Sequence, residues 1–160
     1  MPDPAENLKN HIKQTAAVHG AKYELRKQLG HGGMGVVGVV VESDRYLLVR
    51  RSQTVLAPGK ICFPGGGIEP GESPSQALVR EFQEELGVTV RPVRFDWENV
   101  TPWGVHLQWW IAELAPNQTP IPSPDEVEEV IYLTLEEMLT HPDMLESNRP
   151  YLLKRRENRG

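Results

Sequence analysis

The sequence predicts a single domain that combines several strands with a few helices, either α+β or α/β with a mixed sheet. Three observations support this prediction. The 160 residues are enough for one domain and leave little for a second. β-branched runs bounded by turn residues recur along the chain, which is typical of strands. One helix, over residues 74–86, has complete start and end signals.

The first elements are expected to form a hairpin. The runs 36–43 and 45–52 are rich in β-branched and other apolar residues, and they meet at Ser43 and Asp44, which favour a turn. Prolines and glycines then exclude a regular helix from residues 53–72, so this stretch is predicted to be a loop.

The helix over residues 74–86 follows from its boundary residues. Ser73 and Gln76 have the spacing of a capping box, in which each side chain bonds the backbone N–H of the other residue. Pro74 occupies the first helical position, where no N–H is needed. Gly87 stands where a helix ends in left-handed backbone.

The rest of the chain continues with strands and short helices. Strands are predicted over 88–97, 105–114 and 129–135, a proline-rich loop over 115–124, and helices over 135–141 and from Pro150 onward. We expect three regions in all: an N-terminal extension over 1–30, in which residues 4–19 form a short helix or a loosely held segment, the main domain over 31–156, and a tail over 157–160.

Charge and composition limit the partners. The formal net charge is −5, and basic residues gather only at 154–160, which argues against a nucleic-acid polymer as partner. The most apolar run, 34–41, is far too short to span a bilayer, so no membrane partner is expected. The single cysteine, Cys62, permits no internal disulfide, and the start of the chain has no signal pattern. We therefore expect a cytoplasmic protein.

The predicted helix has an apolar arc and an acidic arc. The apolar arc contains Leu78, Val79, Phe82 and Leu86, and the acidic arc contains Glu81, Glu84 and Glu85. Such carboxylates repel one another, and a solvated acidic face is the simple interpretation. The glycine-rich loop before the helix favours another interpretation, because glycines let backbone groups approach a ligand and clustered carboxylates suit Mg²⁺ or Mn²⁺. The pattern thus predicts a divalent cation that binds a polyphosphate.

The same residues match a known signature. Every defined position of G-x₅-E-x₇-R-E-U-x-E-E-x-G-U, with U apolar, is filled by Gly66, Glu72, Arg80, Glu81, Phe82, Glu84, Glu85, Gly87 and Val88. On this match the chain resembles the Nudix hydrolases, over about residues 34–155. The resemblance implies an α/β/α sandwich around a mixed β-sheet. It also implies attack by water on a phosphoanhydride in a nucleoside diphosphate linked to another group.

The resemblance further implies roles for motif residues. Glu84 and Glu85 would be the main ligands of Mg²⁺ or Mn²⁺, and the Gly65 carbonyl a backbone ligand. Glu81 would be a further ligand or the base that activates water. Some family members carry the base on a later loop, and Glu126, in the acidic segment 123–130 before a strand, is the alternative candidate.

Two further motif residues are expected to support the site. Arg80 would brace the carboxylates through hydrogen bonds and so contribute to catalysis. Glu72, at the junction of loop and helix, would hold the loop or a metal-bound water.

The substrate is expected to be a small-molecule nucleoside diphosphate derivative. ADP-ribose, coenzyme A, NADH, dinucleoside polyphosphates and nucleoside triphosphates stay open. Each tryptophan is a candidate for stacking on a base or for core packing: Trp97, Trp103, Trp109 and Trp110. The neighbours Trp109 and Trp110 would point to opposite faces of a strand. Arg50 and Arg51 are candidate phosphate contacts.

Three hypotheses of function follow. The leading one is a Mg²⁺-dependent pyrophosphohydrolase. The second is a non-catalytic sensor domain that binds a nucleotide metabolite, which the complete set of motif acids disfavours. The third is a dimerisation module formed by residues 1–30, which would make the protein a homodimer.

Overall fold

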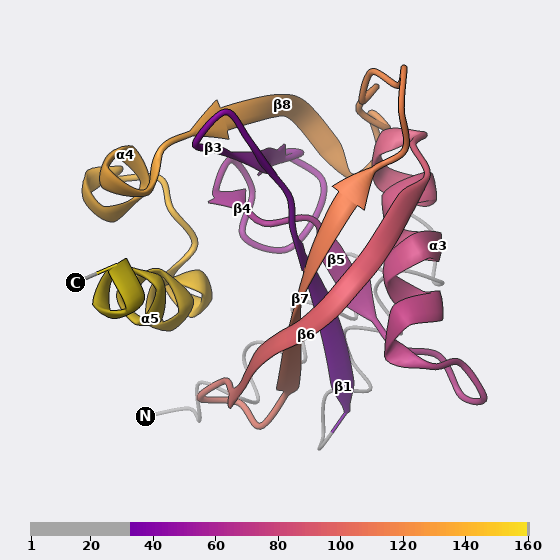
Figure 1. The fold of residues 1–160 in the computed structure, drawn as a ribbon, viewed down its shortest axis with the longest axis horizontal. Coiled ribbons are helices and arrows are strands. Elements are labelled where there is room, and N and C mark those ends of the chain that lie inside the picture. The colour runs from indigo at the N-terminus through magenta and orange to yellow at the C-terminus, as the bar shows by residue number, and fades with distance from the viewer. Residues whose placement is uncertain (1–32, 160) are drawn as a thin grey trace.

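The structure is a computed structural model that describes residues 33–159 (Figure 1). The N-terminal extension predicted over 1–30 and its short helix lie outside the described residues. In chain order the described elements are β1 (Met34–Val39), β2 (Val41–Glu42), β3 (Arg45–Arg51), β4 (Ile61–Cys62), β5 (Gly65–Gly67), α3 (Pro74–Leu86), β6 (Val90–Val100), β7 (His106–Leu114), β8 (Val127–Leu133), α4 (Leu135–Thr140), the 3₁₀ turn η1 (Glu146–Asn148) and α5 (Arg149–Arg159).

The strands form two four-stranded sheets. In the first sheet the strand order is β5–β1–β7–β6. Strand β1 runs antiparallel to β5 and parallel to β7, and β6 forms an antiparallel hairpin with β7. In the second sheet β3 pairs antiparallel with β2, β4 and β8. The parallel pair makes the first sheet mixed, as the sequence predicts.

Helices cover the strands on two sides (Figure 1). On one side α3 packs through its apolar arc, with Leu78 and Phe82 fully buried in one cluster with Val36 of β1. On the other side α4 and α5 pack through Met138 and Tyr151, which are also fully buried. This arrangement confirms the α/β/α sandwich around a mixed sheet.

The hairpin forms only in part, whereas the long helix has the predicted form. Of the run predicted over 36–43, only Val41 and Glu42 of β2 pair with β3, because β1 belongs to the other sheet, where it pairs with β5 and β7. Ser43 and Asp44 connect β2 to β3 with φ angles of 48° and 68°, the left-handed backbone of a two-residue hairpin turn. Helix α3 has the predicted bounds, and both hydrogen bonds of the capping box between Ser73 and Gln76 are present. Gly87 ends the helix at a φ of 62°.

Strands β4 and β5 lie within residues 53–72, which the sequence predicts as a loop. Strand β5 consists of three glycines and pairs with residues 35–37 of β1. A Cβ atom on Gly65 would overlap the carbonyl oxygen of Val36, so only glycine lets the two strands approach this closely. The loop prediction is wrong here because it interprets these glycines as a sign of flexibility.

The later elements match their predictions with shifted ends. Strand β6 extends to Val100, β8 begins at Val127, and α5 continues to Arg159 across most of the predicted tail. Within residues 33–159, every helix is too short or too polar to cross a lipid bilayer.

Candidate active site

The three acids of helix α3 have different surroundings. Glu81 and Glu85 have relative exposures of 0% and 4%, whereas the side chain of Glu84 is 26% exposed. A solvated acidic face is therefore the wrong interpretation for Glu81 and Glu85. Burying a carboxylate is costly unless positive charge or hydrogen bonds compensate, and Arg80 supplies such a contact to Glu81 at 2.8 Å.

Glu126 joins these two acids. One carboxylate oxygen from each of Glu81, Glu85 and Glu126 lies within 4.8 Å of the others. We call these three residues the acid trio. Glu126 comes from the segment directly before β8, far from α3 in the sequence. The structure thus brings together two acids of the motif helix and the alternative candidate for the base.

Hydrogen bonds on two sides fix the segment that carries Glu126. On one side the N–H of Ser123 donates to the carbonyl of Glu85 at 2.9 Å, near the end of α3. On the other side, at the end of β3, the N–H of Ser52 donates to the carbonyl of Glu126 at 3.1 Å. The hydroxyl of Ser52 also donates to the carbonyl of Asp125 at 3.0 Å. The segment is therefore held between α3 and β3.

Arg80 connects the acids to the loop before α3. Its Nη1 donates to Glu81 Oε1 at 2.8 Å and to Glu84 Oε2 at 3.3 Å. Its Nε and Nη2 donate to the two carboxylate oxygens of Glu72 at 2.8 and 2.9 Å. Nη2 also donates to the carbonyl of Gly67 at 2.9 Å. One guanidinium group thus orients three motif carboxylates relative to the glycine loop.

The motif glycine leaves room for an acid of the trio. A Cβ atom on Gly66 would overlap the carboxyl group of Glu81. Gly65, whose carbonyl is the expected backbone ligand, precedes it in β5. Both glycines line the same cavity as Glu85 and Glu126. The glycine loop and the acidic helix therefore depend on each other sterically.

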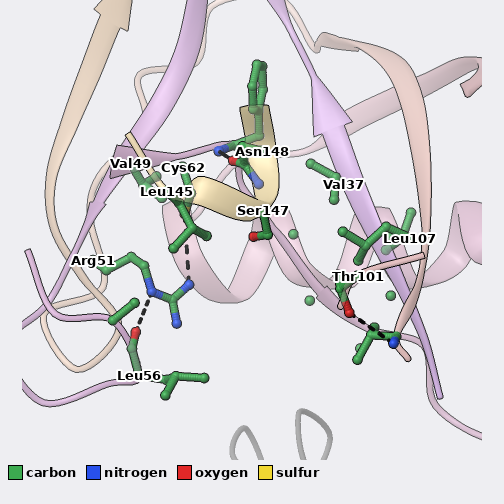
Figure 2. A pocket seen from close by; sticks show the side chains of 18 of the residues that line it. Val37, Val49, Arg51, Leu56, Cys62, Thr101, Leu107, Leu145, Ser147 and Asn148 are labelled. Atoms are coloured by element: carbon green, nitrogen blue, oxygen red, sulfur yellow. Dashed lines mark hydrogen bonds between the residues drawn. The ribbon is translucent and has the colours of Figure 1, made fainter. Parts of the chain in front are cut away.

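The cavity beside the acid trio has a volume of about 350 Å³, a size that accommodates a small-molecule ligand. Figure 2 shows Arg51 on one side of it, Thr101 and Leu107 on the other, and Asn148 between them. The Oδ1 of Asn148 accepts a hydrogen bond from the N–H of Phe63 at 3.0 Å, which fixes η1 against the end of β4.

The two candidate arginines point to different places. Arg50 donates to the carbonyl of Gly59 at 2.8 Å and to Asp143 at 3.1 Å, and it does not belong to the cavity lining. Arg51 lines the cavity and is only 8% exposed. Its Nε donates to the carbonyl of Leu56 at 2.6 Å. Of the two, Arg51 is therefore placed to bring positive charge to a ligand.

The four tryptophans also differ in whether they lie in the core or at the cavity. Trp109 is fully buried and stacks on Tyr151 with 4.2 Å between the ring centroids. Trp110 packs against the other core cluster, so the two neighbours point to opposite faces, as predicted. Trp97 packs beside Tyr151. Only Trp103, among the tryptophans that the structure describes, lines the cavity.

The sequence analysis did not identify the cavity residues that η1 contributes. Ser147 and Asn148 of η1 belong to the lining. In the sequence they precede a predicted helix, where serine and asparagine are common caps. That local signal indicates nothing about a distant cavity.

The acid trio fits a divalent metal ion. Carboxylate oxygens are the ligands that Mg²⁺ and Mn²⁺ prefer, and two of the three side chains are buried. Glu84, expected as a main ligand, lies outside the trio, and one of its oxygens accepts the hydrogen bond from Arg80.

Comparison with known families decides the relationship. The model of the NUDIX domain matches residues 31–155. The chain belongs to the NUDIX family. The match covers the signature over residues 66–88 together with every strand that the structure describes, which confirms the resemblance found in the sequence.

Individual relatives are similar over shorter stretches. The chain is 46% identical over 54 residues to an 8-oxo-dGTP diphosphatase of Escherichia coli (strain K12), covering 33% of this chain and 42% of the relative. It is 38% identical over 60 residues to an ADP-ribose pyrophosphatase of Methanocaldococcus jannaschii, covering 36% and 34%. The matched segments thus span less than half the length of these curated relatives.

Among solved structures, the MutT protein from Methanosarcina mazei Go1 is similar with a TM-score of 0.68 and 25% identity, over 80% of this chain and 96% of that one. The chain therefore shares its fold with a protein of almost the same domain size.

Proposed function

We propose that this protein is a Mg²⁺- or Mn²⁺-dependent hydrolase. It cleaves a phosphoanhydride bond in a nucleoside diphosphate that is linked to another moiety. The observation that carries the proposal is the acid trio, which collects three carboxylates at the edge of a cavity of ligand size. Membership in the NUDIX family supports the same reaction class, and both curated relatives named above carry names of diphosphate-cleaving enzymes.

The acid trio would hold the metal, with Glu84 and the Gly65 carbonyl as further ligands. A divalent cation bound there neutralises phosphate charge and lowers the pKa of water. The chain itself contributes orientation. Arg80 holds Glu81 in place through the 2.8 Å hydrogen bond, and Gly66 leaves the space that this carboxylate occupies.

Arg51 would contact a phosphate of the substrate. It lines the cavity together with Glu85 and Glu126, and a buried guanidinium is a strong hydrogen-bond donor to phosphate oxygens. Because the acids carry negative charge, positive charge close by is needed to attract an anionic substrate.

The general base is Glu81 or Glu126. The variants Glu81→Gln and Glu126→Gln, measured side by side, distinguish the two. Glu81 is fully buried and accepts a hydrogen bond from Arg80, so its carboxylate is held in a fixed orientation. A fixed carboxylate suits either a metal ligand or the base. Glu126 is less buried and lies at the cavity. Replacing the base by glutamine removes the acidic limb of the pH–rate profile, whereas replacing a metal ligand mainly raises the metal concentration required.

The test of the proposal is a substrate screen with Mg²⁺ and with Mn²⁺. ADP-ribose, coenzyme A, NADH, dinucleoside polyphosphates and nucleoside triphosphates are each offered to the wild-type protein and to the triple variant E81Q/E85Q/E126Q. We expect metal-dependent turnover of at least one compound by the wild type only. Tight binding of a compound without turnover would support the sensor hypothesis and overturn the proposal.

A further inference from the structure

The turn between β6 and β7 carries a large aromatic side chain at the cavity. Trp103 is 43% exposed and belongs to the cavity lining. Leaving an indole this exposed forgoes the burial that stabilises most tryptophans. The other three tryptophans pack against side chains of the protein, so the exposure of Trp103 is a feature of this position.

Hydrogen bonds fix the backbone of this turn. The N–H of Thr101 donates to the carbonyl of Val105 at 2.9 Å, and the N–H of Val105 donates back to the hydroxyl of Thr101 at 3.0 Å. The N–H of Gly104 closes the turn on the carbonyl of Thr101 at 2.9 Å, with a φ of 85° that favours glycine. Trp103 therefore stands on a hydrogen-bonded turn.

The position of the turn relative to the charged groups suggests a ligand. Thr101 lies on the side of the cavity opposite Arg51 (Figure 2). Glu85 and Glu126 line the same cavity. Glu126 lies on the Arg51 side, because the next residue, Val127, pairs with Arg51. A nucleotide whose phosphates lie at Glu126 and Arg51 therefore extends its base toward the turn.

We propose that Trp103 stacks on the nucleobase of the substrate and so selects substrates with an aromatic base over base-free diphosphates. This assignment rests on the proposed function, because it takes the ligand to be a nucleotide. The indole can stack on either a purine or a pyrimidine base. A purine should bind more tightly because it covers more of the indole. Trp103 thus sets how tightly the base is held, and the acids act on the diphosphate.

Four proteins test the proposal: the wild type, W103L, W103F and F95A. W103L keeps an apolar side chain without a π-system, and W103F keeps a smaller one. Phe95 is the matched control, because it is a similarly exposed aromatic residue on β6 that does not line the cavity. Thermal unfolding monitored by circular dichroism establishes that all four are folded.

The first readout needs neither metal nor turnover. Adenosine is titrated in EDTA and tryptophan fluorescence is followed. We expect saturable quenching in the wild type and F95A, and its loss in W103L. In Mg²⁺, AMP should bind more tightly than ribose 5-phosphate to the wild type, and W103L should lose this preference by about 10- to 100-fold. W103F should lie between them.

The second readout is kinetic. On a nucleotide substrate, W103L should raise KM by about 10- to 100-fold with kcat changed less than about threefold, because the contact holds the base and does not touch the reacting atoms. Unchanged adenosine quenching and unchanged AMP affinity in W103L would overturn the inference. Quenching that depends on Trp103 without hydrolysis of any compound would leave the inference standing and overturn the proposed function.

Discussion

The acid trio and the cavity wall differ in how the chain assembles them. Two acids of the trio, their brace Arg80 and the glycines around them come from one continuous stretch, residues 65–85. The cavity wall comes from separate segments, which contribute Arg51, Trp103 and Asn148. The chemistry is thus encoded locally, and the shape of the ligand site depends on the whole fold.

This difference in assembly indicates where amino-acid substitutions are tolerated. A helix with its loop fixes distances between the acids through backbone geometry, so the reacting centre needs little from elsewhere besides Glu126. The wall residues Trp103 and Asn148 lie on a turn and on η1, and Arg51 lies at the end of β3. At the turn and η1, substitutions can change the ligand without moving the acids. The following predictions test this division, from the largest expected effect to the smallest.

The largest effect is expected for the acid trio. Replacing Glu81, Glu85 or Glu126 singly by glutamine should lower kcat/KM by about 10²–10⁴-fold, because each supplies a charge that holds the cation or accepts a proton. Glu84→Gln should lower it less, by about 10-fold, since Glu84 lies outside the trio and is proposed only as a further ligand. Steady-state kinetics over a range of Mg²⁺ concentrations measures both.

The matched pair Glu84 and Glu85 makes this prediction sharp. The two residues are neighbours on α3 and carry the same charge, and only one joins the trio. Equal losses in E84Q and E85Q would show that the distinction between Glu84 and the acid trio is wrong. Calorimetric titration with Mn²⁺ should show weaker metal binding in E85Q than in E84Q.

The next effect concerns the fit between loop and helix. Gly66→Ala places a methyl group against the Glu81 carboxylate and should weaken metal binding by about 10- to 100-fold. Gly71→Ala is the control, because a Cβ there meets nothing within 4 Å although its φ of 79° is strained. G71A should lose about 1 kcal/mol of stability and keep its affinity for metal. Equal metal affinities in both variants would contradict the steric argument.

A loss of kcat is expected when the brace is removed. Arg80→Gln loses hydrogen bonds to Glu72, Glu81 and Glu84 and should lower kcat by about 10- to 100-fold, because the acids lose their orientation. Arg91→Gln breaks an exposed pair with Glu113 and should change kcat by less than about twofold. Kinetics at saturating substrate and metal compares the two, and a loss of similar size in R91Q would count against bracing.

The sequence predicts the region of the acid trio better than it predicts the cavity wall. Helix α3 was predicted residue by residue, because its caps and its periodicity lie within the helix itself. Strand β5 was not, since the need for glycine there arises from contact with Val36 on a distant strand. Glu126 could be named as a candidate from its acidic segment, but its place beside Glu85 depends on the hydrogen bond at Ser123.

The cavity wall could not be predicted for the same physical reason. Four tryptophans are equivalent in the sequence, and only the packing of Trp109 on Tyr151 and the position of the β6–β7 turn distinguish them. Arg50 and Arg51 are likewise equivalent until the pairing of Arg50 with Asp143 is known. Side-chain environment is a property of the assembled fold.

The smallest effect is expected at the contact that docks α5, whose preceding turn η1 lines the cavity. Asp96 on β6 accepts hydrogen bonds from Tyr151 at 2.8 Å and from Lys154 at 3.0 Å. Burial would raise the pKa of Asp96, but these bonds and one from Arg94 outweigh it and hold the pKa below its ordinary value of 3.8. The carboxylate therefore stabilises the fold above pH 3.8, and this contribution is lost as the pH falls through the lowered pKa.

Asp96→Asn should lower the free energy of unfolding at pH 7 by about 1–3 kcal/mol, because hydrogen bonds to a charged group are lost. The difference from the wild type should shrink as the pH falls below about 3.8, where the wild-type carboxylate takes up a proton. Urea unfolding at pH 7 and at pH 3 measures both values.

In D96N, KM should rise more than kcat falls, since α5 supports Asn148 in the wall, whereas two acids of the trio lie on α3. A fall in kcat with KM unchanged would mean that the wall and the acids are mechanically coupled, and the division between them would not hold.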